Sequence, residues 1–478
     1  MEGLSKGTAM KIVGDDFNER IDAYIDENWD ACLVDIARLV EIPSFEELDK
    51  AAPGAPFGPG PRAALTEVLG IAERMGFAVT DVDGYAGFAE LPGESSTQLG
   101  IIGHVDVVPA GPGWTFPPYE VTIKDGYLMG RGTLDDKGPL MVCLYALKFW
   151  KDQGKQLPYT FRFIFGANEE TDLMDVEHYR KAYADPAFLF TPDAEFSVCY
   201  GEKGGFDATI TSNLITDGLI LEFTGGAATN AVPGEAQALV RGSAEGLPAA
   251  DGITITPEGT DAFRIQAKGK SAHASLPEDG RSAIGMIVDY LLANDLVSAE
   301  ERAFLEVDQK LLNHTDGSGV GIDTADEDFG PLTVVGGTIE LREQRLVQTL
   351  DSRFPTSTDG DKLLVQLRRV FEPVGATVEN TLLLPPFLTD PNSPEIQALS
   401  SAFRDVTGED RKPFTIGGGT YAREFTRGAS FGVEMPWIAN PEWVGGMHGP
   451  DEGESIDQLK TAWKIYALAF GRLCELSL

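Results

Sequence analysis

The sequence predicts a two-domain α/β protein in which a mixed sheet with helices on both faces is interrupted by an inserted α+β domain. Three observations predict this fold class. The chain has 478 residues, enough for two or three packed domains. From Leu99 onward, short apolar runs alternate with helical patterns, the rhythm of a sheet that is covered on both faces. Over residues 201–383 this rhythm gives way to short, alternating segments punctuated by glycine.

Composition and charge narrow the class of protein further. Hydrophobic residues make up 42% of the chain and charged residues 24%, as in ordinary globular proteins and unlike disordered ones. The 75 acidic and 38 basic side chains give a formal net charge of −37, which repels phosphate backbones and anionic lipid surfaces. We therefore expect no nucleic-acid partner and no membrane partner.

Cysteine usage and apolar runs indicate the compartment. Cys32, Cys143, Cys199 and Cys474 are far apart and form no CxxC pair, so neither a disulfide framework nor a thiolate zinc site is indicated. Residues 1–20 contain no apolar core of the length that a signal peptide needs, and no apolar run approaches a membrane span. A soluble cytoplasmic protein is expected.

The first domain is expected to open with two helices. Apolar residues recur at helical spacing over residues 16–40, and EIPSF follows as a stop signal. Residues 45–62 are rich in proline, glycine and alanine, which predicts a surface loop before a second helix over 62–75. Strand and helix patterns then alternate through LGIIGHVD, DKGPLMVCLYALKFW, YTFRFIFGANEE and AFLFTPDAEF.

The middle of the chain predicts a separate α+β lid domain with one clear helix, over residues 282–294. Helical periodicity returns over 396–406 and is followed by a glycine-rich turn and a final helix over 456–476. One domain is therefore expected to be built from both ends of the chain. The expected boundaries are 1–200 and 384–478 for that domain and 201–383 for the lid.

Side chains that bind metals follow three of the predicted strands. In an open α/β sheet, ligands gather at the carboxyl ends of the strands. A pair of aspartates also precedes a predicted helix, and a late histidine lies on the glycine-flanked loop GGMHGPDE. The whole set consists of His104, Asp106, Asp135, Asp136, Glu169, Glu170, Asp193 and His448.

Two imidazoles with several carboxylates and no thiolate suit Zn²⁺, Co²⁺ or Mn²⁺ better than a dedicated Ca²⁺ site. The surplus of carboxylates predicts two ions that share one carboxylate, about 3.5 to 4 Å apart. By itself, a His-X-Asp motif is more often structural than catalytic. Paired acidic residues are more often solvated surface charges than metal ligands. Their joint placement at successive strand ends favours a metal site.

Seven motifs that occur in order along almost the whole chain resemble those of the M20 metallopeptidases, di-metal amidohydrolases that include dipeptidases, carboxypeptidases and N-acyl amino acid deacylases. They are GHVDVVP, MGRGTLDDKGP, FGANEET, TPDAEF, KSAHASLPEDG, GGGTYAR and GGMHGPDE. The long insertion, GEKG and GGGTYAR look most like the PepV-type dipeptidases, the branch that includes Xaa-His dipeptidase.

The resemblance implies a ligand set for each of two metal ions. His104, Asp135 and Asp193 would hold one ion. Asp135, Glu170 and His448 would hold the other, which makes Asp135 the bridge. Zn²⁺ is expected first, with Mn²⁺ or Co²⁺ as alternatives.

The same resemblance implies three features around the ligands. Glu169 matches the general base of the family, which takes a proton from the water and passes it to the leaving amine. Asp106 matches the residue that orients His104 by accepting its other N–H. The peptide bond between Asp135 and Asp136 is cis in the family, so a cis bond is expected here.

The resemblance also implies substrate-binding residues. Asn230 and His273 match polar groups that meet the oxyanion, and Arg353 matches the cation that meets the C-terminal carboxylate. His273 lies in a long motif, whereas a capping role for Asn230 and a surface position for Arg353 are equally open. The glycine-rich segment that would let substrate approach the backbone contains Gly418, Gly419 and Thr420.

These features together indicate a metal-dependent dipeptidase in which a water held between two divalent ions attacks the peptide carbonyl. The alternative is an N-acyl amino acid amidohydrolase with the same chemistry and a blocked amino end. A catalytically inactive binding protein on this fold is disfavoured because no expected ligand or base is missing. The expected partner is a small peptide, and the expected assembly is a monomer or a homodimer.

Overall fold

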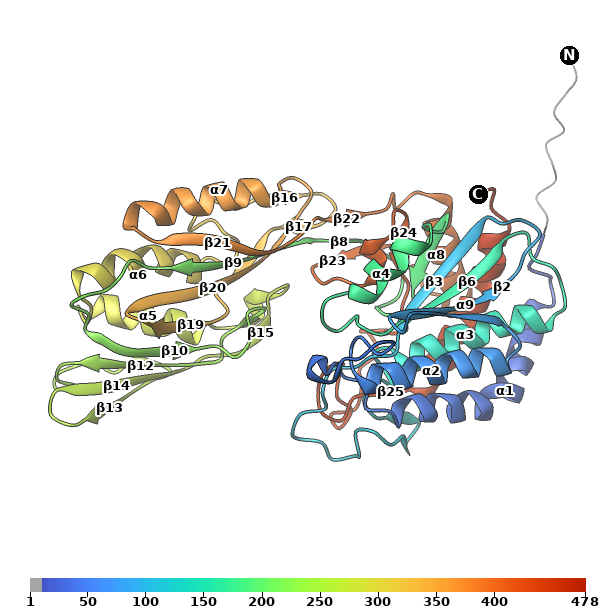
Figure 1. Ribbon diagram of the computed structural model, residues 1–478, viewed down its shortest axis with the longest axis horizontal. Coiled ribbons are helices and arrows are strands. Elements are labelled where there is room, and N and C mark those ends of the chain that lie inside the picture. The colour runs from blue at the N-terminus through green and yellow to red at the C-terminus, as the bar shows by residue number, and fades with distance from the viewer. Residues whose placement is uncertain (1–10) are drawn as a thin grey trace, which may run out of the picture. The chain divides into compact units, whose positions relative to one another are not determined.

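The computed structural model describes residues 11–478, which form two compact units (Figure 1). The first unit contains the chain up to Tyr200, Leu388–Phe414 and Gly419–Leu478. The second unit contains Gly201–Phe387 and Thr415–Gly418. The expected absence of a signal peptide falls in part on residues 1–10, which lie outside the described residues. Within residues 11–478, no helix is both long and apolar enough to cross a membrane.

The core of the first unit is a mixed sheet. Its strands follow the order β1 (Ala78–Val82), β2 (Ala86–Leu91), β6 (Thr160–Gly166), β3 (Gln98–His104), β7 (Phe188–Thr191) and β24 (Gly428–Ser430). After β24 the sheet continues to β8 (Cys199–Glu202), which pairs with both β22 (Phe387–Leu388) and β23 (Phe414–Ile416). Strands β6, β3, β7 and β24 run parallel. Strands β1 and β2 form an antiparallel edge.

Helices cover both faces of this sheet. Successive side chains of a strand point to opposite faces, and both faces of these strands carry buried apolar residues. On one face, the core also includes residues of α1 (Phe17–Val40), α2 (Pro59–Arg74), α3 (Lys137–Asp152), α8 (Pro394–Thr407) and α9 (Ile456–Cys474). The other face packs against α4 (Met174–Ala182) and η4 (Tyr421–Glu424). In β3, Ile101 belongs to the first core and Ile102 to the second. The predicted fold class is confirmed.

The five helices predicted for the first unit are also confirmed. Helices α1, α2, α8 and α9 correspond to the expected ranges 16–40, 62–75, 396–406 and 456–476, and no end differs by more than three residues. The helical stripe of DKGPLMVCLYALKFW forms α3, which is buried along most of its length. Figure 1 shows α1, α2 and α3 together below the sheet of this unit.

The second unit is an antiparallel α+β structure with its own core. Its sheet has the order β13 (Ile253–Glu258), β14 (Ala262–Lys268), β12 (Glu235–Arg241), β10 (Ile220–Gly225), β19 (Ile339–Arg342), β20 (Arg345–Phe354), β9 (Gly204–Thr211) and β21 (Thr377–Leu384). Strand β18 (Thr333–Val335) also pairs with β20. Its helices are α5 (Ala283–Ala293), α6 (Ala299–Leu312) and α7 (Gly360–Phe371).

The prediction of one clear helix in this region was incomplete. The expected helix over 282–294 is α5, but α6 and α7 were missed although both carry start signals. Helix α6 begins with a capping box formed by Ser298 and Glu301, a pattern visible in the sequence as Ser-X-X-Glu. Helix α7 begins at Asp359, whose side chain accepts a hydrogen bond from the Lys362 N–H.

A small antiparallel sheet in the first unit joins two parts of the chain that are far apart in sequence. It consists of β25 (Gly453–Ser455), β5 (Tyr127–Met129) and β4 (Thr122–Lys124), in that order. Next to it, the Gly130 N–H donates to the carbonyl of Glu452 at 2.9 Å. The segment after β5 therefore lies beside the segment before β25, and each carries a candidate metal ligand.

Candidate metal centre

Three parallel strands bring candidate ligands to one edge of the sheet. His104 is the last residue of β3 and is fully buried. Glu169 and Glu170 follow the end of β6, and Asp193 follows the end of β7. Because β3 pairs in parallel with both β6 and β7, their carboxyl ends meet at the same edge. The structure thus brings together the strand-end residues that the sequence singled out.

The turn before α3 carries the fourth carboxylate. Its peptide bond between Asp135 and Asp136 is cis, which confirms that expectation. The Asp136 side chain is buried and its Oδ2 accepts a hydrogen bond from the backbone N–H of His104 at 3.1 Å. Asp136 thereby ties the turn to the end of β3, and Asp135 faces the strand-end residues.

Asp135 lies between the two imidazoles, with one carboxylate oxygen directed to each. Its Oδ1 is 2.9 Å from His104 Nε2, and its Oδ2 is 3.0 Å from His448 Nε2. His448 Nε2 is also 3.0 Å from Glu170 Oε2, and His104 Nε2 is 3.6 Å from Asp193 Oδ2. The five expected ligands therefore form one cluster with two halves that share Asp135.

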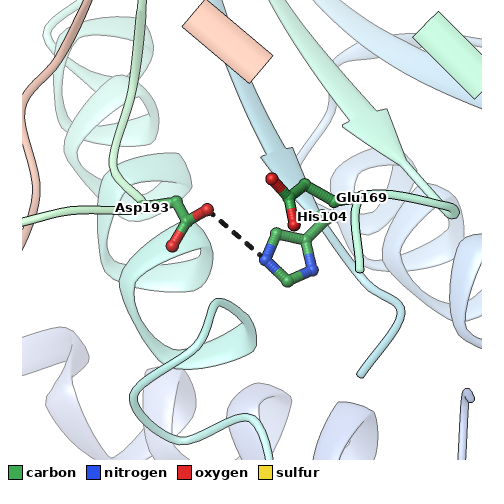
Figure 2. Close-up of side chains that lie close together, drawn as sticks. All are labelled: His104, Glu169 and Asp193. Atoms are coloured by element: carbon green, nitrogen blue, oxygen red, sulfur yellow. Dashed lines mark ion pairs between the residues drawn. The ribbon is translucent and has the colours of Figure 1, made fainter. Parts of the chain in front are cut away.

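Glu169 also belongs to this cluster. Figure 2 shows its carboxylate beside His104 and Asp193, with the ion pair between His104 and Asp193 dashed. One ligand atom from each of these three residues lies within 4.8 Å of the others, as do atoms of His104, Asp135 and Glu170. By position alone, Glu169 is placed to bind an ion as well as to move a proton.

Asp106 contacts the His104 ring most closely through its backbone carbonyl oxygen. The Asp106 carbonyl oxygen is 3.0 Å from His104 Nδ1, within hydrogen-bonding distance, whereas Oδ1 of the carboxylate is 3.6 Å away. The carboxylate instead accepts a hydrogen bond from the Glu170 N–H at 3.1 Å through Oδ2. Asp106 therefore links the end of β3 to the loop that carries Glu170.

The cluster concentrates negative charge in a buried place. Burial raises the pKa of Glu169 well above its usual value, and the neighbouring carboxylates of Asp193 and Glu170 raise it further. Burial likewise raises the pKa values of Asp193 and Glu170. Hydrogen bonds to Asp135 and Glu170 raise the pKa of His448 to about 11. Buried carboxylates that repel one another, next to two imidazoles, form a donor set that fits divalent cations.

Asn230 and His273 lie close together in the second unit. Strand β11 (Ala231–Val232) pairs with β15 (Ala272–His273), which places Ala231 opposite His273. The Asn230 carbonyl accepts a hydrogen bond from the Ala274 N–H at 2.9 Å. His273 Nδ1 lies 2.7 Å from the Ser275 hydroxyl. Asn230 caps none of the helices in the described part of the chain, so the capping alternative is not supported.

Arg353 lies on β20 of the second unit and is not a surface arginine. Its side chain is 14% exposed and forms an ion pair with the buried Asp351. Nε and Nη2 donate to the two Asp351 carboxylate oxygens at 2.8 Å and 2.6 Å. This pair uses one edge of the guanidinium group and leaves Nη1 on the other side.

The glycine-rich segment divides between the two units. Gly418 belongs to the second unit, and Gly419 and Thr420 to the first. A Cβ atom at Gly418 would meet only Ile416, at 3.9 Å, whereas one at Gly419 would lie 2.5 Å from Arg423 Nη1. The Thr420 side chain caps η4 by accepting from the Ala422 N–H. A side chain at Gly419 would therefore have to displace the flexible end of Arg423, whereas the Cβ direction at Gly418 is open.

Two residues that support the Glu169 loop were missed by sequence reasoning. Oδ2 of the buried Asp175 accepts hydrogen bonds from the N–H groups of Ala167 and Asn168, at 2.6 Å and 2.9 Å. The hydroxyl of buried Tyr421 donates to the same oxygen. Tyr421 stands in the motif GGGTYAR, but its partner lies 246 residues away, and no local pattern indicates the pair.

The comparisons with known proteins agree with this geometry. The sequence matches the profile of peptidase family M20/M25/M40 over residues 100–472. "Putative dipeptidase YtjP" of Bacillus subtilis is 32% identical over 457 residues, which cover 92% of this chain and 96% of that protein. A Staphylococcus aureus protein with the same dipeptidase designation is 31% identical over 485 residues, which cover 96% of this chain and 99% of that protein.

Solved structures share the fold. Human carnosine dipeptidase 1 has a TM-score of 0.61 at 16% identity, over 97% of this chain and 100% of that one. The dipeptidase Dug1p of Saccharomyces cerevisiae has a TM-score of 0.60 at 13% identity, over 98% of this chain and 100% of that one. Aminoacylhistidine dipeptidase of Vibrio alginolyticus has a TM-score of 0.56 at 14% identity, over 92% of this chain and 96% of that one. At these identities the likeness is one of fold.

Proposed function

The chain belongs to peptidase family M20/M25/M40, and from this premise we propose that it is a dipeptidase whose active site holds two divalent metal ions. The names of its relatives in Bacillus subtilis and Staphylococcus aureus support the substrate class. Within the family, the long insertion and the motifs GEKG and GGGTYAR favour the PepV-type branch.

The position of Asp135 carries the proposal of a two-ion centre. Each of its carboxylate oxygens faces a different imidazole, His104 on one side and His448 on the other. Asp193 completes the first side and Glu170 the second. Nitrogen and oxygen donors without thiolate suit Zn²⁺, with Mn²⁺ and Co²⁺ as alternatives. We assign the shared ligand to Asp135 on this ground.

The chemistry divides between the ions and the chain. Two divalent ions would lower the pKa of a water held between them and polarise the scissile carbonyl. We assign the proton transfer to Glu169, whose buried carboxylate lies at the edge of the cluster and has a raised pKa. A carboxylate with a raised pKa is suited to accept a proton from water and to deliver it to the departing amine near neutral pH.

Residues outside the metal cluster are assigned to the substrate. Asn230 and His273, brought together by β11 and β15, supply polar groups for the developing oxyanion. Arg353 supplies the cation for the substrate C-terminal carboxylate. The backbone at Gly418, where the Cβ direction is open, is assigned with Gly419 and Thr420 to close approach of the substrate. None of these residues is assigned to a metal ion.

A hydrolysis panel tests the proposed substrate class. Purified protein loaded with Zn²⁺, Mn²⁺ or Co²⁺ is incubated with free Ala-Ala, Ala-His, an N-acetyl amino acid and a tetrapeptide, and products are quantified by chromatography. We expect hydrolysis of the free dipeptides and little of the others, with Ala-His among the best substrates if the PepV-type assignment holds. Preferential release of acetate from the N-acetyl amino acid would select the amidohydrolase instead.

Arg353→Ala should raise KM for free dipeptides by about 10 to 10² fold, because it removes a charge-assisted pair with the substrate carboxylate. For dipeptides with an amidated C-terminus the change should be small, because the pair is already absent. Steady-state kinetics on matched free and amidated substrates measure the difference. Equal changes on both would show that Arg353 is not the carboxylate anchor.

Two further variants control for the partner of Arg353. Removing the guanidinium leaves Asp351 buried without its ion pair, which destabilises the second unit. Arg353→Lys keeps a positive charge beside Asp351 and should show a weaker form of the same selectivity. Arg342→Ala, on the neighbouring strand β19 and 64% exposed, should leave both substrates unaffected.

A further inference from the structure

Arg131 and Glu452 form a buried ion pair. Neither residue has been assigned a role so far. Their side chains are 1% and 0% exposed, and Nη1 of Arg131 donates to Oε2 of Glu452. Arg131 lies four residues before Asp135, and Glu452 lies four residues after His448. Each member of the pair is thus close in sequence to a proposed ligand, and the two are 321 residues apart.

Glu452 fixes the turn that carries Asp135. Its Oε1 accepts hydrogen bonds from the backbone N–H groups of Gly132, Leu134 and Asp135, at 2.8 Å, 3.1 Å and 3.2 Å. Backbone N–H groups that converge on one anionic oxygen form a concave nest, which defines the path of the turn. One of the three belongs to Asp135 itself, so the carboxylate of Glu452 positions the backbone of the shared ligand.

Arg131 extends the connection to the loop that carries His448. Its Nη2 donates to the His448 carbonyl at 3.2 Å, while Nη1 is engaged by Glu452. The guanidinium group also lies against the Trp114 ring, 5.2 Å from its centroid. Because the guanidinium group is planar and rigid, its two arms hold a fixed spacing between Glu452 and the His448 carbonyl.

The loop of His448 is also held through Asp451, which accepts hydrogen bonds from the Thr115 and Phe116 N–H groups at 2.7 Å and 3.0 Å, but His448 itself has an unfavourable backbone conformation. His448 has a positive φ of 61° and a side chain that is 53% exposed, and it is flanked by Gly446 and Gly449. A non-glycine residue in the left-handed region needs support from its surroundings. By contrast, His104 stands at the end of a buried central strand.

We propose that Arg131 and Glu452 are positioning residues that hold Asp135 and His448 at the separation required to share one metal ion. The proposal rests on the two-ion centre proposed above. It assigns the pair to one half of the cluster, because Asp135, Glu170 and His448 would hold the ion that depends on the two loops. The other ion also uses Asp135, but its two remaining ligands, His104 and Asp193, lie at or just after strand ends and do not contact the pair, so that ion should lose less affinity.

Glu452→Gln is a sharp test because an amide cannot replace both functions of the carboxylate. Oε1 of Glu452 accepts from three backbone N–H groups, and Oε2 accepts from the guanidinium group of Arg131. The glutamine amide has a single acceptor oxygen, so its NH₂ group must face donors on one side or the other. We expect the affinity for one of the two ions to fall about 10 to 100 fold, the usual effect of removing a partner that orients a metal ligand.

Metal binding is measured directly, without reliance on catalysis. Wild type and Glu452→Gln are equilibrated with buffered free Zn²⁺ or Co²⁺ over a range of concentrations, and bound metal per chain is determined by elemental analysis. At free-metal concentrations where wild type holds two ions, the variant should hold one. With excess metal, its kcat should recover toward wild type while KM for a free dipeptide stays unchanged.

Two more variants separate positioning from general stability. Arg131→Lys keeps the charge but loses the planar fork, so it should weaken the same ion by a smaller factor. Glu90→Gln removes a comparable partly buried ion pair, that of Glu90 with Arg162, which contacts none of the proposed ligands. It should lower the melting temperature without changing metal stoichiometry.

The outcomes distinguish this proposal from the proposed function. If wild type binds two ions and Glu452→Gln binds both with wild-type affinity, the positioning role is wrong and the two-ion dipeptidase stands. An equal loss of affinity for both ions would also overturn it. If wild type binds fewer than two ions, the two-ion centre fails and this inference fails with it. Thermal unfolding in the presence of chelator establishes that each variant is folded before metal is added.

Discussion

Removal of metal ions should abolish dipeptide hydrolysis, and Zn²⁺, Mn²⁺ or Co²⁺ should restore part of it. Every proposed ligand is an imidazole or a carboxylate, and neither type of side chain can replace a divalent cation in polarising a peptide carbonyl. Without cations, the buried carboxylates around Asp135 are left to repel one another or to take up protons, as the raised pKa of Glu169 indicates. The expected residual activity is that of the uncatalysed reaction.

The measurement compares activity with bound metal in the same samples. Protein is treated with a chelator, freed of it by dialysis, and analysed for metal before each ion is added back in known equivalents. Activity should rise mainly with the second equivalent per chain if two ions act together. Circular dichroism of the metal-free protein serves as the control for folding. Full activity in a verified metal-free preparation would falsify the proposed mechanism.

The ligand positions could be predicted from the sequence because they depend on local patterns. Buried parallel strands are recognisable as short apolar runs, and their carboxyl ends meet at one edge of the sheet. This reasoning indicated His104, the pair Glu169 and Glu170, and Asp193, and their ligand atoms lie close together in the structure. The choice of Glu170 as the ligand came from the family resemblance. The glycine-flanked segment GGMHGPDE indicated a loop around His448, and the structure gives that residue a positive φ.

The contacts that support the ligands could not be predicted, because they join residues that are distant in sequence. Arg131 pairs with Glu452 and Asp175 with Tyr421 across 321 and 246 residues. Nothing in the flanking residues of either partner signals the other. The detail at Asp106 was equally inaccessible, since the choice between its carbonyl and its carboxylate depends on backbone conformation after β3.

The helices of the second unit were also predicted only in part. Helix α5 is almost uniformly apolar and was predicted, whereas α6 and α7 are polar on their outer faces. Their apolar residues contribute to the core of this unit, for example Phe304 and Leu367. The capping signals at Ser298 and Asp359 identify their starts, and giving these signals more weight than the glycine-rich texture would have found both helices.

Glu169 and Glu170 are similar in position and are distinguished by their contacts. Both follow β6, both carboxylates have raised pKa values, and each belongs to a group of possible ligands with His104. The contacts favour Glu170 as the ligand, since its Oε2 lies 3.0 Å from the His448 imidazole and its Oε1 accepts from the Val108 N–H. Glu169 faces His104 and Asp193 instead (Figure 2).

Glu169→Gln should therefore lower kcat by about 10² to 10⁴ fold with both metal ions retained, because the amide keeps the size of the side chain but cannot accept a proton from water. Glu170→Gln should instead reduce bound metal, because an amide oxygen is a weaker ligand than a carboxylate for the ion shared with His448 and Asp135. Steady-state kinetics and elemental analysis on the same preparations separate the two effects.

The variants differ by one position in a single loop and make the same chemical change, so each is the matched control for the other. Loss of metal from Glu169→Gln together with retained metal in Glu170→Gln would exchange the two roles, and it would place Glu169 with His104 and Asp193 as a ligand of the first ion.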